Sequence, residues 1–311
     1  MKKIFITLAL FLISLFPTYA CDICGCGVGS YYLGILPEFN KRFAGLRYQH
    51  KSLQTHLGPR GERTHLTNDE TYQSLEAWGA WNLGEKWRIM AILPYNFNSR
   101  EIVMRDEEGK KDGLGDVAVM GYYKIFENMA ATENNKLFVH SMWAGLGIKA
   151  PTGKYDQAER ASASQDSPNN FQLGTASTDV MVNVAYDARL MDAGVNVNLN
   201  YKLNTENKYE YRYGNKVTAN VLAYYKFFID NKFRIAPNIG LMYEKQQKDE
   251  IYGRYRVAQS GGFAATGIVG AEFNIGKLSF GANYQSPFSQ NLADGRALAG
   301  DRIMTHISFG F

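Results

Sequence analysis

Three residues with metal and redox chemistry stand close together near the start of the chain. Cys21, Cys24 and Cys26 are all the cysteines of the 311-residue sequence. Thiolates at Cys-x-x-Cys-x-Cys spacing can converge on one soft ion such as copper or zinc. In an oxidising compartment, two of them would instead form a disulfide and leave one free thiol. Lipidation of Cys21 is the third interpretation, although residues 18–20 lack the aliphatic residue expected three positions before a lipidated cysteine.

The remaining candidate groups do not form an enzyme motif. The histidines are scattered, at His50, His56, His65, His140 and His306. The sequence has no His-Glu-x-x-His motif and no nucleophile elbow. The GLGD sequence at 113–116 is not a phosphate loop, because no helix is expected to follow it. We therefore expect no enzymatic activity, and no cofactor other than a soft metal ion at the cysteines.

The N-terminus indicates export. Lys2 and Lys3 precede an apolar stretch at 4–16, and the small residue Ala20 stands directly before Cys21. This arrangement is typical of a secretory signal peptide. The apolar stretch is shorter than the run of about 20 residues that a membrane-spanning helix needs. We expect cleavage after Ala20, which places Cys21 at the start of the mature chain.

The composition favours a large all-β protein. The chain is 45% hydrophobic, 14% aromatic and 21% charged, and it contains 30 glycines. The mean hydropathy of −0.30 excludes a protein built of several transmembrane helices. The formal charge of +4 comes without a dense basic patch, so nucleic acid is not expected as a partner.

Apolar and polar residues alternate over many segments. Val195, Val197 and Leu199, for example, are separated by Asn196 and Asn198. In a strand these two sets point to opposite faces. Strands are expected near 43–56, 72–83, 86–100, 114–126, 136–149, 171–190, 193–204, 214–229, 232–247, 262–275, 277–288 and 302–311.

The connections and strand lengths favour a transmembrane antiparallel β-barrel of about 12 strands over a soluble sandwich. Short turns alternate with long polar loops, such as 105–113 and 151–170, as in barrels with tight periplasmic turns and longer outer loops. Many runs reach about ten residues, the length that a tilted strand needs to cross hydrocarbon. Aromatic residues recur near the strand ends, and the chain finishes with an alternating strand ending in Phe311.

Three glycine-containing motifs carry a family resemblance. They are GLGD at 113–116, GLGIKAPTGK at 145–154 and FQLGTASTD at 171–179. They resemble motifs of the outer-membrane transporter family named for the meta-pathway of phenol degradation. Ala150 and Ala176 replace the Leu and Gly that are commoner there. The resemblance implies a barrel with a transport role for hydrophobic compounds, but it brings no substrate-binding residues.

If the apolar faces contact lipid, a set of charged residues lines the lumen. The candidates are Arg47, Glu76, Arg88, Asp116, Lys124, Asp187, Arg189, Lys202, Lys226, Arg234, Glu244 and Glu272. Both signs are present, so the wall is not obviously selective for cations or anions. The alternative is a salt-bridged filling that only stabilises the barrel. About 12 strands leave room for a narrow conduit but not for a wide pore.

These observations predict an exported outer-membrane protein with a signal peptide at 1–20, a periplasmic Cys-rich segment at 21–38 and a barrel at 39–311. We expect it to bind or pass a small, hydrophobic molecule. The alternatives are metal handling through the cysteines and a structural barrel with a filled lumen. Expected partners are outer-membrane lipid, a small-molecule solute and the barrel-assembly machinery, which would recognise the strand ending at Phe311.

The three interpretations of Cys21, Cys24 and Cys26 predict different masses and thiol counts. A thiolate site would retain copper or zinc through purification under reducing, metal-replete conditions. A disulfide would leave one titratable thiol and no metal, and lipidation would add acyl mass at Cys21. Intact mass, thiol titration and metal analysis of the native protein separate these outcomes. Absence of metal under reducing conditions would contradict the metal-handling alternative.

Overall fold

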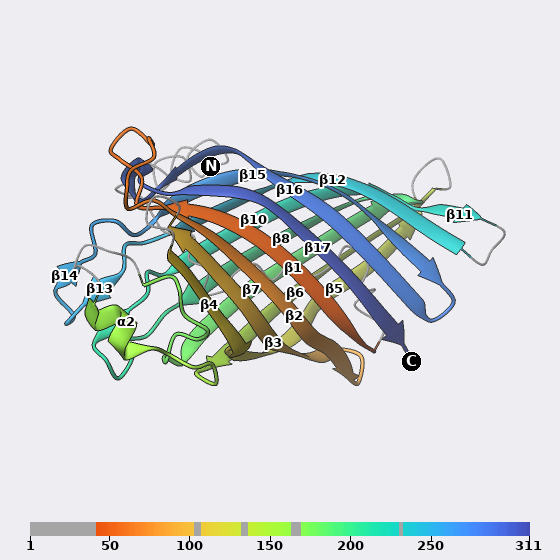
Figure 1. Cartoon of the computed structure of the whole chain (residues 1–311). Helices are drawn as coiled ribbons and strands as arrows, with labels where there is room; N and C mark the ends of the chain where they lie inside the picture. The colour runs from red at the N-terminus through yellow and green to blue at the C-terminus, as the bar shows by residue number, and fades with distance from the viewer. Residues whose placement is uncertain (1–41, 103–106, 132–135, 163–168, 230–232) are drawn as a thin grey trace, which may run out of the picture.

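The strands close into a barrel. The computed structural model describes residues 42–102, 107–131, 136–162, 169–229 and 233–311. These residues form an antiparallel barrel of 12 strands, which confirms the expected fold class (Figure 1). The first strand, β1 (Phe43–Thr55), pairs with the last, β17 (Leu298–Gly310). This pairing removes the free edges that an open sheet would present to lipid.

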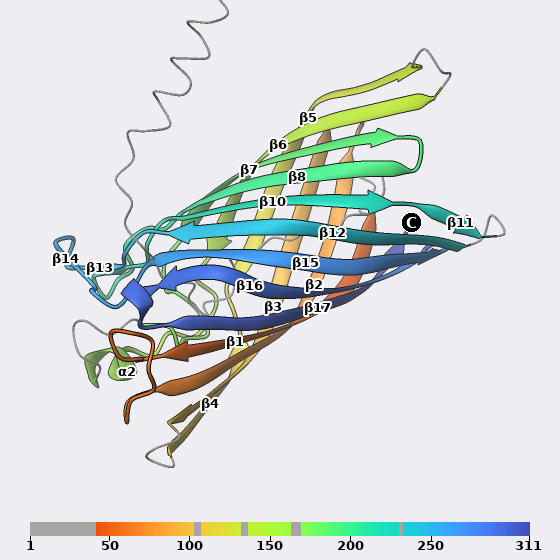
Figure 2. The same ribbon diagram turned by 90° about the horizontal axis from the view of Figure 1, so that it is seen from above.

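The other wall strands follow one another around the barrel in chain order. They are β2 (Asn68–Leu83), β3 (Trp87–Ile102), β5 (Val117–Ala131), β6 (Leu137–Ala150), β7 (Asp179–Leu190), β8 (Ala193–Leu203), β10 (Lys216–Tyr225) with its extension β11 (Phe227–Ile229), β12 (Phe233–Gln246), β15 (Gly262–Ile275) and β16 (Leu278–Leu292). Each pairs with its neighbours in antiparallel register. In the view from above, β7, β8, β10, β12, β15 and β16 lie side by side in this order (Figure 2).

Turn lengths distinguish the two ends of the barrel. The connections at 84–86, 191–192 and 276–277 are short, whereas 56–67 and 151–178 are long. Short turns mark the periplasmic end and long loops the outer end. The outer end also carries α2 (Gln157–Ser162), the turn η2 (Ala293–Gly295) and a small sheet of β9 (Tyr211–Arg212), β13 (Glu250–Ile251) and β14 (Tyr255–Arg256). No helix in the described part of the chain is long and apolar enough to cross a membrane.

Alternation along each strand separates a lipid-facing surface from an inner wall. On β8, Val195 and Leu199 are 40% and 48% exposed, whereas Asn196, Asn198 and Asn200 are buried inside. Aromatic side chains cluster outside near the periplasmic ends, for example in the contacts Trp87–Tyr123 and Trp81–Phe311. An apolar outer belt with aromatic residues at its rim is typical of barrels that cross an outer membrane.

Two segments differ from the expectation. Residues 171–178 are not a strand: β7 begins at Asp179, and the preceding residues fold into the barrel. Asn98 Nδ2 of β3 donates to the backbone oxygen of Gln172 at 3.1 Å. A side chain of the inner wall, rather than a neighbouring strand, thus supplies the hydrogen-bond donor for this backbone oxygen. The expected polar loop at 105–113 instead contributes β4 (Glu107–Leu114), which pairs with the outer end of β3.

The ladder between the last two strands stops before their outer ends. β16 and β17 are paired from Leu278 and Phe309 up to Gln285 and Arg302. Beyond that point lies Pro287, which has no backbone N–H to donate to a ladder hydrogen bond. The Gln290 side chain then bridges the strands, with Nε2 donating to Ala299 O at 2.9 Å and Oε1 accepting from Ala299 N at 2.7 Å. A side chain thus takes over from backbone pairing in the outer part of this strand pair.

The two faces of β8 should respond differently to the same substitution. Val197→Arg would place a cation against lipid and should cost about 2–4 kcal/mol near the bilayer midplane. Asn198→Arg would place it among the polar side chains of the lumen and should cost less. Equilibrium unfolding of both variants in lipid vesicles measures the difference. Equal costs would contradict the assignment of faces.

Candidate functional site in the barrel lumen

The charged residues singled out from the sequence all lie on the inner wall. Arg47, Glu76, Arg88, Asp116, Lys202, Lys226, Glu244 and Glu272 are buried there, and Lys124, Asp187, Arg189 and Arg234 are half-buried. The structure brings most of them into separate networks along the lumen rather than into one cluster. Their contact with a solute remains a prediction.

The most buried network lies at the outer end, around Lys149. Its ammonium group is 2.6 Å from Asp116 Oδ2 and 2.8 Å from Asp179 Oδ2, and it also donates to the hydroxyl of Thr175. Lys202 Nζ lies 3.3 Å from the same Asp179 oxygen. Two lysines thus balance two carboxylates, so the network is neutral overall. Buried charges require such pairing and hydrogen bonding.

The three motif segments of the sequence meet at this network. Asp116 comes from the first, Lys149 from the second, and Thr175 from the third. Asp116 Oδ1 accepts from Gly153 N at 3.0 Å, and its Oδ2 accepts from Thr175 N at 2.9 Å. Gly153 packs so closely against Gly174 that an added Cβ would lie 2.7 Å from the other's Cα. The glycines therefore let two backbone segments approach the Asp116 carboxylate together.

Sequence reasoning identified Asp116 and Lys202 but missed Lys149, Thr175 and Asp179. Lys149 occupies an inward position two residues after Gly147 on β6, and its side chain is fully buried. Alternation with the outward Ile148 was the signal that could have placed it on the inner wall. Thr175 and Asp179 could not be found this way, because the segment that leads into β7 has no strand period.

A second network lies across β10, β12 and β17. Glu244 is fully buried, with Lys216 Nζ 2.7 Å from Oε1 and Arg302 Nη1 2.6 Å from Oε2. Here one predicted residue, Glu244, is held by two basic residues that the sequence analysis did not include. This network and the one around Lys149 both lie towards the outer ends of their strands.

A third row of polar contacts crosses β15, β16, β17, β1 and β2. Arg47 Nε donates to Glu76 Oε2 at 2.6 Å, and His306 Nε2 lies 3.0 Å from Glu272 Oε1. Arg47 and His306 are register partners, so the two pairs lie side by side. On β16, between Glu272 and His306, stands Gly281, where a Cβ would lie 2.2 Å from His306 Nε2. The missing side chain makes the Glu272–His306 contact possible.

At the periplasmic end, a tyrosine connects three strands. Tyr224 on β10 reaches across β8 to Asp187 on β7, with its hydroxyl 3.1 Å from each carboxylate oxygen. It passes over Gly194, where a Cβ would lie 2.3 Å from the Tyr224 ring. Lys226 Nζ lies 5.3 Å from the centre of the Tyr224 ring, and Arg189 is two residues after Asp187 on β7. Three of the predicted lumen residues are thus brought together here.

A large part of the inner wall is apolar. One buried cluster spans β1 to β7 and includes Trp78, Ile92, Met120, Trp143 and Met181. A smaller cluster near the outer end joins Phe171 to residues of β1, β2, β15 and β16. Aqueous pores have a predominantly polar interior. The interior of this barrel combines ion pairs and many buried asparagines with this packed apolar cluster.

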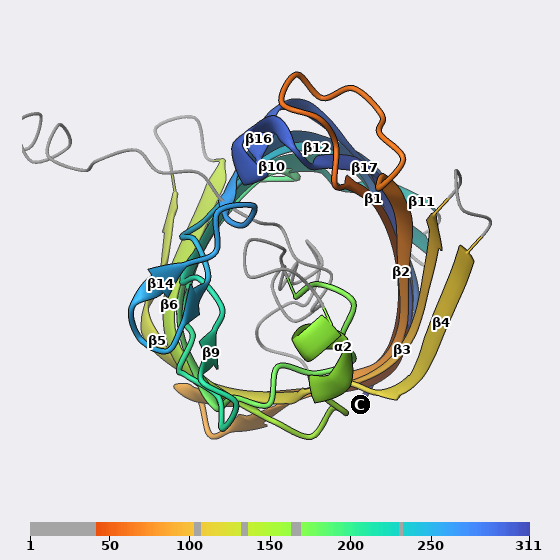
Figure 3. The same cartoon turned by 60° about the vertical axis from the view of Figure 1, so that its left-hand side comes forward.

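Residues 151–162 and 169–178 lie in the outer mouth, where α2 is seen inside the ring of strands (Figure 3). Asp156 precedes α2 and accepts from Glu159 N at 3.2 Å, which lowers the pKa of its carboxyl. Arg100 Nη1 of β3 lies 2.8 Å from Glu159 Oε1, and Lys111 of β4 contacts the same carboxylate. These contacts attach α2 to one side of the wall.

The predicted metal ligands Cys21, Cys24 and Cys26 lie outside the described residues, as does the predicted signal peptide. Within the described ranges, no group of three or more His, Cys, Asp or Glu side chains could hold a metal ion. The choice between metal, disulfide and lipid therefore remains a prediction.

The closed wall and the apolar outer belt define an outer-membrane β-barrel. The chain belongs to the family described as "Putative MetA-pathway of phenol degradation", whose model matches residues 59–291. This match confirms the family resemblance carried by the three motifs.

Comparison with solved structures agrees with this fold. An outer-membrane channel from Pseudomonas putida F1 superposes with a TM-score of 0.62 at 16% identity, covering 91% of this chain and 100% of that one. The β domain of the Bordetella autotransporter BrkA gives a TM-score of 0.49 at 11% identity, covering 88% of this chain and 100% of that one. The first supports the barrel fold. No curated protein matched the chain.

Removing the central cation of the outer network should release the segment that it holds. Lys149→Met would leave Asp116 and Asp179 buried with less compensation, at a cost of about 3–5 kcal/mol. We expect protease added to intact cells to cut within 153–178 faster than in the wild type. Lys154→Met, at an exposed position, is the matched control and should not change the rate. Unchanged cleavage in Lys149→Met would contradict this role.

Proposed function

We propose that this barrel passes small, predominantly apolar molecules across the outer membrane. The apolar sector of the inner wall, with Trp78, Met120, Trp143 and Met181 on adjacent strands, is the observation that carries this proposal. Methionine and aromatic side chains adapt to apolar ligands of different shape. Membership of the phenol-degradation family supports the same solute class.

The charged network around Lys149 fits this proposal. Strongly hydrated ions are attracted by unbalanced charge, but the carboxylates around Lys149 and Lys202 are balanced by equal numbers of ammonium groups. A neutral solute meets no electrostatic barrier when it passes such a network. Residues 151–162 and 169–178 narrow the outer mouth, which favours small solutes over large ones.

Permeation through purified barrels in liposomes tests the proposal. We expect a small neutral aromatic solute to enter faster than a neutral sugar of similar size, because the apolar sector stabilises it in transit. Met181→Gln keeps the side-chain volume but makes this sector polar, and it should slow the aromatic solute several-fold. Asn220→Gln, on the polar inner face of β10, is the matched control and should leave the ratio unchanged.

Two results would contradict the proposal. One is faster entry of the sugar than of the aromatic solute. The other is an equal effect of Met181→Gln and Asn220→Gln. Far-UV circular dichroism and heat-modifiable gel mobility establish beforehand that each variant is a folded barrel.

A further inference from the structure

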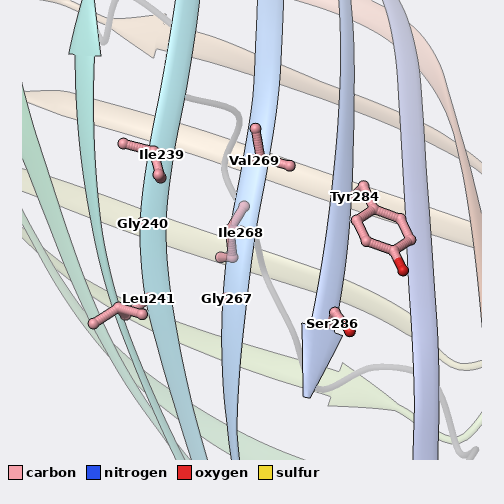
Figure 4. Close-up of a pocket in the computed structure, with 8 residues that line it drawn as sticks. All are labelled: Ile239, Gly240, Leu241, Gly267, Ile268, Val269, Tyr284 and Ser286. Carbon is pink, nitrogen blue, oxygen red and sulfur yellow. The ribbon is translucent and has the colours of Figure 1, made fainter. Parts of the chain in front are cut away.

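The outer surface of the barrel has a groove that the lumen function does not use. It crosses β12, β15 and β16 and has a volume of about 470 Å³ (Figure 4). Ile239, Leu241 and Val269 line it and are 65%, 59% and 55% exposed on the lipid-facing side. Pockets that hold small ligands typically have volumes of about 300–1,000 Å³. The groove is therefore large enough to hold part of a lipid molecule.

The groove exists because Gly267 has no side chain. Gly267 is outward-facing on β15, with Leu241 as its register partner on β12 and Ser286 on β16. A Cβ at this position would meet only Ser286 O, at 3.9 Å. The backbone at Gly267 is also outside the left-handed region. Neither strain nor crowding requires glycine here, so the space that it leaves is available to another molecule.

Polar groups at one end of the groove indicate how deep in the membrane the groove lies. At its outer edge, Ser286 Oγ donates to Asp301 Oδ1 at 2.7 Å, and the exposed Asp301 carboxylate points away from the lumen. This is also where the β16–β17 ladder ends, one step beyond Gln285. Both an outward carboxylate and unpaired backbone are tolerated at the headgroup level but not in hydrocarbon. The groove therefore begins at the outer interface and extends into the apolar layer.

We infer that this groove is a binding site for one acyl chain of an outer-membrane lipid. Its lining is continuous with the lipid-facing belt of β12 and β15, so hydrocarbon is the medium that reaches it. The Ser286–Asp301 pair, with Tyr284 beside it, lies where the polar part of the same lipid would be. The chain fills the space left by Gly267 and packs against Ile239, Leu241 and Val269.

Electron paramagnetic resonance of a chain-labelled lipid tests this inference. The full barrel is reconstituted in phosphatidylethanolamine vesicles containing a phospholipid with a nitroxide on its acyl chain, and the immobilised lipid per barrel is counted. Gly267→Leu fills the groove with a side chain and should lower this number by about one, since the groove accommodates a single chain. Gly267→Ala fills it in part and should weaken immobilisation while changing the fold least.

Ala271→Leu is the matched control. Ala271 lies on the same face of β15 but does not line the groove, so the number of immobilised lipids should equal that of the wild type. The inference is overturned if Gly267→Leu retains all the immobilised lipid, or if Ala271→Leu loses as much. It is also overturned if wild-type barrels associate through this face and Gly267→Leu separates them, because the occupant is then a second copy. None of these results depends on solute passage through the lumen.

Discussion

Satisfaction of backbone hydrogen bonds in hydrocarbon is the constraint on which this structure depends. Inside a bilayer each unpaired N–H or C=O group costs several kcal/mol, so a sheet can cross only if it closes. The pairing of β1 with β17 closes it, from Phe43 and Gly310 at the periplasmic end to Gln54 and Leu298 at the outer end. Strict alternation follows, because each strand then has one face towards lipid and one towards the lumen.

Closure also creates the interior in which charged groups have to be balanced. Lys149 and the Arg47–Glu76 pair meet this requirement with partners close by in the wall. Glu244 is held by Lys216 on the adjacent β10 and by Arg302 on the more distant β17. The network around Lys149 does more than balance charge, because it fixes a non-strand segment inside the outer mouth. Apolar side chains of one sector and uncharged polar side chains, many of them asparagine, occupy the remaining inner wall.

The barrel could be predicted from sequence because the pattern that indicates each strand lies within one short segment of the chain. A period of two residues, as in 195–203, is visible wherever one face is polar and the other apolar. The outer network could not be predicted, because it depends on contacts such as Asp116 with Thr175, which are 59 residues apart. The motif at 171–179 was expected to form the start of a strand. Its glycine and small polar residues give no periodicity that would distinguish a strand from a segment folded against the inner wall.

The bridge that Gln290 makes between β16 and β17 affects how the wall opens transiently. Amide exchange with solvent requires local separation of paired strands, and it is slowest where the ladder is continuous. From Leu278 to Gln285, β16 is paired on both sides, whereas beyond Gln285 side-chain hydrogen bonds of Ser286 and Gln290 connect it to β17. The outer part of this strand pair should therefore open at a lower free energy than its continuously paired part between Leu278 and Gln285.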